Sequence, residues 1–205
     1  MTTSTRDKLL AIGLEQFSQR GFDGVSIASI ADALGLSKQA LLHHFSSKEK
    51  LYGEILARIS SEFEGRVAAL TPGSDTPESI AALMVGLFED SQEHPQQTSL
   101  LMRELLDNSQ RARRAGRWFL RDFLAGLIDR VHALPPWRHH PRAMAEAAAY
   151  QLLGAVNYFA ISTVTLRAIL GNEEYTAMHA AFPGQLKAMA LATLSAGPIM
   201  GATSD

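Results

Sequence analysis

Apolar residues recur every three or four positions along most of the chain, which is the spacing of helices with one buried face. Within residues 5–20 this spacing predicts a helix that ends at Gly21, because a glycine past the last turn commonly stops a helix. Ser26 and Ser37 each precede a short apolar repeat and are expected to cap a short helix. A fourth helix is expected over residues 48–67. No stretch alternates apolar and polar residues as a half-buried strand does, so the chain is predicted to be all-α.

Proline and glycine divide the rest of the sequence into further helices. The turn-rich segment at residues 71–77 is the clearest boundary, and Pro141 is expected to begin a long helix that Gly171 closes. Pro183 is expected to interrupt the helical pattern near the end, because proline lacks a backbone N–H. Helices are therefore predicted over residues 78–93, 98–108, 112–133, 141–170, 173–181 and 183–196.

Composition narrows the possible functions. The 205 residues are 46% hydrophobic, include no cysteine and carry a formal net charge of −2. Such a chain can bury a core, so it is not expected to be disordered, and it offers no disulfide, thiolate nucleophile or cysteine metal site. The polar N-terminus predicts no signal peptide. Residues 147–166 have no formal charge, but polar residues such as Gln151 and Thr163 lie among them, so we expect a buried helix of a cytoplasmic protein rather than a membrane span.

Residues 26–45 read SIASIADALGLSKQALLHHF and have the pattern of a helix-turn-helix. Two short helices meet at a tight turn that contains Gly35. Ala40, Leu41 and Phe45 are expected to face inward and leave a polar, partly cationic outer face, which suits the major groove of DNA. A helical hairpin that is packed for stability, or that binds a protein, is the alternative. The candidate DNA contacts are Ser26, Ile27, Ser37, Lys38, Gln39, Ala40, Leu42, His43, His44 and Lys48.

Residues 6–63 resemble the DNA-binding domain of the TetR family of bacterial transcriptional regulators. The resemblance rests on Phe17, Gly21-Phe22, Ser26-Ile27, Ile30-Ala31, Gly35-Leu36-Ser37-Lys38, His44-Phe45, Lys48 and Leu51. It implies a homodimeric repressor that binds a palindromic DNA operator and is released by a small-molecule effector. It also implies a DNA-binding domain over residues 1–50, a connector helix over 48–67, and a ligand-binding and dimerisation domain over 68–205.

One position departs from the family pattern. Family members commonly carry a tyrosine whose hydroxyl contacts phosphate where this chain has Leu42, which cannot donate a hydrogen bond. Either that phosphate contact is lost, or His43 and His44 replace it. Because histidine changes its charge between about pH 5 and 8, DNA binding by this pair would depend on pH.

The long helix that follows Pro141 carries two apolar stripes. A helix that is apolar nearly all round must be covered on both sides, here by its own chain and by a partner subunit. A central helix in a monomer is the alternative. One stripe contains Tyr150, Leu153, Asn157, Ile161 and Val164. The narrower stripe, of mostly small residues, would allow a second subunit to approach closely and is the candidate dimer interface: Ala145, Ala149, Leu152, Val156 and Ala160.

Aromatic and methionine residues with a few polar neighbours are candidates for an effector pocket, and their apolar character favours a lipophilic or aromatic effector. The same residue types at helical spacing are more often part of an ordinary core. The candidates are Met84, Phe88, Met102, Leu106, Trp118, Phe119, Phe123, Tyr150, Asn157 and Tyr158.

The sequence contains no glycine-rich phosphate loop, no Gly-x-Ser-x-Gly elbow and no His-Glu-x-x-His motif. No enzyme activity, cofactor or metal is therefore expected. A ligand-insensitive DNA-binding activator and a helical dimerisation or interaction module stay open as alternatives to a ligand-responsive repressor.

Overall fold

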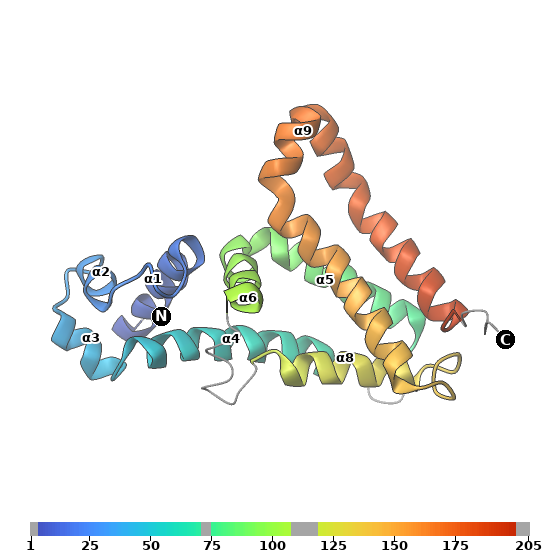
Figure 1. Ribbon diagram of the computed structural model, residues 1–205, viewed down its shortest axis with the longest axis horizontal. Coiled ribbons are helices and arrows are strands. Elements are labelled where there is room, and N and C mark those ends of the chain that lie inside the picture. The colour runs from blue at the N-terminus through green and yellow to red at the C-terminus, as the bar shows by residue number, and fades with distance from the viewer. Residues whose placement is uncertain (1–3, 71–74, 108–118, 200–205) are drawn as a thin grey trace. The chain divides into compact units, whose positions relative to one another are not determined.

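The computed structural model of the chain describes residues 4–70, 75–107 and 119–199, and every regular element within these ranges is a helix (Figure 1). The predicted all-α fold class is confirmed. The helices are α1 (Thr5–Arg20), α2 (Ile27–Asp32), α3 (Lys38–His44), α4 (Lys48–Ala68), α5 (Pro77–Glu93), α6 (Pro95–Asp107), α8 (Arg121–Ala133) and α9 (Arg142–Ala196).

The chain divides into two compact units that are not consecutive stretches of sequence. The first unit contains residues 1–62 and 94–119, and the second contains residues 63–93 and 120–205. The helix α6 therefore belongs with α1, α2 and α3, although it follows α5 in the chain. The helix α4 begins in the first unit and ends in the second.

The first unit is built from short helices with well-defined ends. At the start of α1 the Ser4 hydroxyl accepts a hydrogen bond from the Asp7 amide, and Gly21 follows the last turn with a φ of +71°. This helix has the bounds that the sequence predicts. Apolar side chains from five helices meet in the core of the unit. Its large, fully buried side chains include Leu9, Phe17, Ile30, Leu41, Leu51, Leu56 and Leu100.

The second unit packs α5 and α8 against α9 around one core. The helix α9 consists of two arms that meet at Gly171, whose φ of +80° breaks the helical geometry (Figure 1). The end of the long helix after Pro141 is thus where the sequence predicts it. Trp137 Nε1 donates a hydrogen bond to the Leu194 carbonyl at 2.8 Å and fixes the end of the second arm. By length and composition α9 could also cross a membrane, a test that core helices of soluble proteins also pass.

Pro183 does not begin a new helix, which corrects the expectation of a break at this residue. Residues 172–196 form one arm with Pro183 inside it. Buried residues of one core lie on both sides of the proline: Tyr175 before it, and Leu186 and Leu194 after it. This shared packing holds the helix together despite the backbone hydrogen bond that proline removes.

The helix predicted over residues 112–133 is also corrected, because α8 begins only at Arg121. Phe119 and Leu120 form a turn, and the Phe119 carbonyl accepts a hydrogen bond from the Ser60 hydroxyl. The chain passes from the first unit to the second at this point. Residues 108–118, and residues 71–74 of the predicted turn, lie outside the described residues.

Candidate nucleic-acid interface

The segment from α2 to α3 has the geometry of a helix-turn-helix. Ser26 Oγ accepts a hydrogen bond from the Ser29 amide at 3.0 Å, and Ser37 Oγ accepts one from the Ala40 amide at 3.2 Å. These caps satisfy amides that a helix start leaves unpaired. Between the two helices Gly35 adopts a φ of +64°, which residues with a side chain rarely adopt. Both predicted caps and the predicted turn are present.

The helix α3 has a buried side and an exposed side. Leu41 is fully buried and Phe45 is 3% exposed, so these two side chains anchor α3 to the first unit. Ala40 and Leu42 are half-buried at the border between the two sides. The other predicted contacts on α2, α3 and their caps are the half-buried Ile27 and the exposed Ser26, Ser37, Lys38, Gln39, His43 and His44.

A buried polar pair ties α1 to the helix-turn-helix. Gln16 Nε2 donates a hydrogen bond to the Ser29 carbonyl at 3.1 Å, and the Ser29 hydroxyl donates to Gln16 Oε1 at 2.9 Å. Gln16 is only 9% exposed, and a buried amide without partners would be costly. The reciprocal bonds therefore fix the position of α2 relative to α1.

Ion pairs tie α1 to α4. Arg6 pairs with Glu54, and Arg58 lies 2.8 Å from Asp7. The Arg6 guanidinium also lies 4.7 Å from the centroid of the Phe45 ring, at the end of α3. The pKa of Asp7 lies below its ordinary value because the Ser4 hydroxyl donates to its carboxylate, with a further contribution from Arg58.

The side chain of Lys48, predicted as a DNA contact, is engaged inside the protein. Its ammonium donates hydrogen bonds to the carbonyls of Phe22 and Val25, both at 3.0 Å, in the loop between α1 and α2. The neighbouring Glu49 has a lowered pKa, because its own backbone amide and the Ser47 hydroxyl both donate to its carboxylate. The contact of Lys48 with DNA stays a prediction, but its ammonium already has two partners.

The helix α6 contributes residues that the sequence analysis did not single out. Arg103 Nε donates to the Ser18 carbonyl at 2.9 Å, and an Arg103 terminal nitrogen donates to the Gln19 carbonyl at 3.1 Å. The Tyr52 hydroxyl lies 2.7 Å from Glu104 Oε2. No local signal in the sequence indicates these contacts, because the partners are 52 to 85 residues apart.

The predicted effector residues are divided between the two units, and within the second unit they do not share one environment. Met84, Phe88 and Phe123 are buried in the core of the second unit, whereas Tyr150 and Tyr158 are 67% and 72% exposed. The others are Asn157, half-buried in the second unit; Met102 and Phe119, half-buried in the first; Leu106, exposed in the first; and Trp118, which lies outside the described residues.

An aromatic cluster in the second unit joins Phe88 to residues of α9. The ring centroid of Phe88 lies 5.2 Å from that of Phe159 and 4.9 Å from that of Phe182. The ring of His179 lies 5.8 Å from both Phe88 and Phe159, and its Nε2 is 3.3 Å from Gln92 Oε1. The helical spacing of the aromatic residues in the second arm is visible in the sequence, but their contact with α5 is not.

The narrow stripe of small residues on α9 belongs to the core of its own chain. Ala145 and Ala149 are fully buried, Leu152 and Val156 are 2% exposed, and Ala160 is half-buried. This packing corrects the expectation that a partner subunit covers the stripe, because small residues here allow α5 and α8 to approach α9 within one chain. The exposed apolar residues of the first arm lie on its other side: Tyr150, Tyr158, Ile161, Val164 and Ile169.

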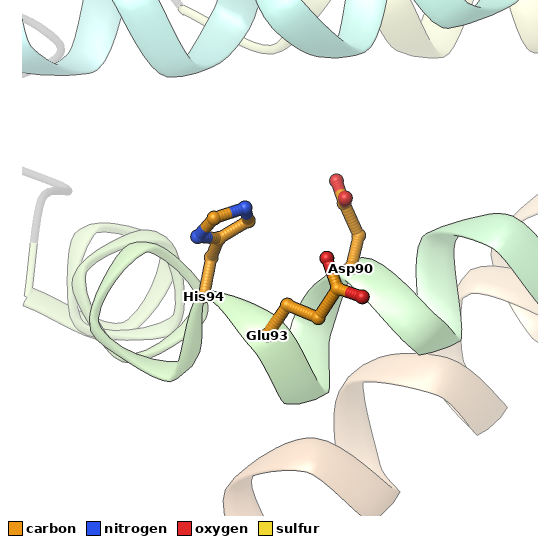
Figure 2. Close-up of side chains that lie close together, drawn as sticks. All are labelled: Asp90, Glu93 and His94. Atoms are coloured by element: carbon orange, nitrogen blue, oxygen red, sulfur yellow. The ribbon is translucent and has the colours of Figure 1, made fainter.

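Three potential metal ligands lie close together where α5 ends. Asp90, Glu93 and His94 have ligand atoms within 4.8 Å of one another (Figure 2). Glu93 and His94 are exposed, and Asp90 already accepts a hydrogen bond from Arg66. Exposed acidic groups are common without a metal, so this arrangement alone does not assign one.

Comparison with known proteins identifies the N-terminal helices. Residues 9–55, from α1 into α4, match the family described as bacterial regulatory proteins, tetR family. The chain is 32% identical over 136 residues to the transcriptional regulator RutR of Escherichia coli K12, covering 64% of this chain and 60% of that protein. It is 32% identical over 87 residues to the transcriptional repressor KstR2 of Mycolicibacterium smegmatis, covering 42% of each. The matched regions thus span between 42% and 60% of these relatives' lengths.

Solved structures share the fold. A TetR-family transcriptional regulator from Bordetella parapertussis matches with a TM-score of 0.69 and 20% identity, over 98% of this chain and 100% of that one. A transcriptional regulator from Aquifex aeolicus matches with a TM-score of 0.64 and 22% identity, over 91% and 99%. These relatives are described as regulators, in agreement with the expectation that the chain is not an enzyme. The capped helix-turn-helix and the family match over the same helices have one explanation: residues 9–55 form a domain of the tetR family of bacterial regulatory proteins.

Proposed function

We propose that the chain is a cytoplasmic, homodimeric transcriptional repressor that binds a palindromic operator and releases it on binding a small apolar or aromatic molecule. The proposal rests on the placement of α3. Its polar side is exposed, while Leu41 and Phe45 are buried and anchor its other side to the first unit. A helix held in this way fits the major groove of DNA. In this proposal residues 1–50 bind DNA and α4 is the connector. Residues 68–205 bind the effector and the second subunit, apart from α6, which packs in the first unit.

The residues on the exposed side of α3 and at its border supply different contacts in this proposal. Gln39 can read adenine through two hydrogen bonds, and Lys38 can reach guanine or a phosphate. Leu42 offers an apolar contact to a thymine methyl group in place of the phosphate bond that a tyrosine would make. His43 and His44 lie exposed at the end of the helix, where their ring N–H groups can donate hydrogen bonds to the DNA backbone.

The dimer interface is proposed on the exposed side of α9. Tyr158 and Val164 on the first arm are 72% and 81% exposed, and an extended exposed apolar surface is typical of a protein–protein interface. A second copy that packs through the same face would form a two-fold symmetric dimer. Exposed positions on the second arm are small and would let a helix of the second copy approach closely: Ala177, Ala181, Gly184 and Ala188.

The aromatic cluster around Phe88 supports an effector with aromatic or apolar character. Phe88, Phe159 and Phe182 supply apolar contact area, and His179 with Gln92 supplies a polar pair beside them. Binding sites for small molecules combine these features. A titration of apolar and aromatic compounds against the protein–DNA complex tests this step, and compounds that release DNA should lose potency in Phe88→Ala.

Selection of bound sequences from a random DNA pool, at a stated salt concentration, tests the proposal as a whole. We expect enrichment of a palindrome whose half-sites are about 34–36 Å apart, one turn of DNA. The double variant Lys38→Ala, Gln39→Ala should bind that sequence at least about tenfold more weakly, since each base contact contributes about 1–3 kcal/mol. Lys187→Ala removes the same charge from the second unit and serves as the matched control.

Several outcomes would contradict the proposal. If no sequence is enriched, or if the double variant and the control bind DNA equally well, α3 is not the DNA reader. Val164→Glu places a charge on the exposed face of α9 and should shift the dimer to monomer in sedimentation, so an unchanged mass would place the interface elsewhere. A transcription assay on the enriched sequence separates a repressor from an activator, because only a repressor lowers transcript levels.

A further inference from the structure

The carboxyl end of α1 has an unusual set of partners for its carbonyl groups. The last turn of a helix leaves carbonyls without helical N–H partners. Here the Phe17 carbonyl accepts from the Gly21 amide at 2.9 Å, as in many helix ends. The next two carbonyls, of Ser18 and Gln19, accept from the guanidinium of Arg103 at 2.9 and 3.1 Å. A side chain of α6 therefore completes the end of α1.

A guanidinium suits this position for two reasons. Its planar fork can donate to two neighbouring carbonyls at once, and its positive charge is favourable at the negative end of the helix dipole. Hydrogen bonds from a charged donor are stronger than neutral ones. Lysine would keep the charge but not the fixed geometry of the two bonds.

The loop that follows α1 is held by a second cation. Lys48 donates to the carbonyls of Phe22 and Val25. Arg103 therefore binds the end of α1, and Lys48 binds two points along the segment between α1 and α2. Ser26, the cap of α2, comes directly after Val25. Because the segment is short and held at both places, its position sets where α2 begins.

The helix α6 that carries Arg103 is itself anchored in the first unit. Leu100 is fully buried and Leu101 is 6% exposed. On the next turn Glu104 accepts a hydrogen bond from the Tyr52 hydroxyl of α4. Arg103 thus extends from a fixed helix and can transmit the position of that helix to α1.

We propose that Arg103 is a positioning residue for DNA binding: by completing the carboxyl end of α1 it fixes the loop that places α2 and α3 for the major groove. This inference rests on the proposed DNA-binding function. It predicts that α6 is needed for tight DNA binding although it makes no contact with the bases, and that displacement of α6 weakens DNA binding through this one side chain.

Binding of the full-length chain to the sequence enriched from the random pool tests the inference over a range of salt concentrations. Arg103→Met keeps the side-chain stem but removes both bonds, and should weaken binding by roughly fivefold to tenfold, the loss expected for such hydrogen bonds. The slope of binding constant against salt on logarithmic axes should not change. Arg103→Lys should recover part of the affinity, and Arg138→Met, exposed in the second unit, is the matched control for loss of one charge.

Amide hydrogen exchange distinguishes a positioning role from a general stabilising role, because only a positioning role predicts a local change in exchange rates. In Arg103→Met the amides of residues 21–26 should exchange faster, while those of α5 and α8 should keep their wild-type rates. If Arg103→Met binds as tightly as wild type, the positioning role is overturned. If the salt slope falls by about 0.9, Arg103 contacts a phosphate directly, which also overturns it.

A second variant allows the inference to be tested even if Arg103→Met does not fold. Tyr52→Phe removes the hydroxyl bond to Glu104 and keeps the ring, so it should weaken DNA binding by a smaller factor in the same direction. If Tyr52→Phe and Arg103→Lys, each measured alone, both bind DNA as tightly as the wild type, the inference is contradicted. If the wild-type chain itself enriches no sequence, the proposed function fails first and this inference fails with it, whereas equal binding by all variants overturns the inference alone.

Discussion

The ammonium of Lys48 lies 4.2 Å from the centroid of the Phe22 ring while it donates hydrogen bonds to two carbonyls of the same loop. The ring packs in turn on Phe17 and Tyr52, with centroids 6.0 and 5.0 Å away. A lysine near the amino end of a helix that follows a helix-turn-helix would ordinarily be assigned to a DNA phosphate. Its surroundings indicate a structural role instead.

Lys48→Met should therefore destabilise the protein. The variant leaves the carbonyls of Phe22 and Val25 without their donor, and we expect the free energy of unfolding in urea to fall by roughly 1–3 kcal/mol. Lys50→Met, exposed on the same helix, is the control and should change it little. A loss of DNA affinity with unchanged stability and a smaller salt slope would instead make Lys48 a phosphate ligand.

Gly24→Ala should also destabilise the loop between α1 and α2. A Cβ at this position would lie 2.4 Å from the Arg20 carbonyl oxygen, which is backbone and cannot easily move away. We expect a loss of about 2 kcal/mol or more in thermal or urea unfolding, typical of a steric conflict in a fixed segment. Gly65→Ala in α4 meets no atom within 4 Å and should stabilise the helix by about 0.5–1 kcal/mol. Equal effects for the two variants would contradict this account.

Acid should weaken the first unit through Asp7 and Glu49. The pKa of each carboxyl is lowered in the folded state, by the Ser4 hydroxyl for Asp7 and by a backbone amide and Ser47 for Glu49. A group with a depressed folded pKa stabilises the fold above its unfolded pKa, and that stability is lost as the pH falls through the folded pKa.

The urea midpoint of the wild type should therefore fall as the pH drops from about 5 to 3, a window that contains the ordinary carboxyl pKa. Asp7→Asn with Glu49→Gln should show a shallower fall, and the two proteins should converge at the lowest pH. Curves that stay parallel over the whole range would show that these two carboxyls contribute no pH-dependent stability.

His43 and His44 should contribute to DNA binding. Both are exposed at the end of α3, with ring centroids 6.0 Å apart, and a ring N–H there can donate a hydrogen bond to the DNA backbone. Replacement of both by alanine should weaken DNA binding by roughly fivefold or more, and replacement of the exposed His139 in the second unit should not. Equal affinity of the double variant and the wild type would contradict the role of the pair.

The sequence predicts most of the first unit because its signals are local. Ser26, Ser37 and Gly35 act on neighbouring residues, so caps and turn can be recognised from a short window. The end of the long helix at Gly171 is predicted for the same reason. The burial of Leu41 and Phe45 follows from helical spacing alone.

The errors concern contacts between distant segments. The break expected at Pro183 is overridden by core packing on both sides of it, and periodicity cannot tell which apolar stripe of α9 faces its own chain. The role of Arg103 is invisible for the same reason, since Ser18 lies 85 residues away. Residue type also cannot separate a buried candidate for the effector pocket from an exposed one. Phe123 lies in the core and Tyr150 is exposed, because they lie on different faces of their helices.

The loop between α1 and α2 is held through main-chain carbonyls, which every residue possesses. Arg103 and Lys48 bind the backbone of Ser18, Gln19, Phe22 and Val25 and make no hydrogen bond to their side chains in doing so. An exposed residue such as Gln19 can therefore change freely during evolution without moving α2. The two cations lie in α4 and α6, so a mutation that damages the placement of α3 can arise there, far along the gene from α3 itself.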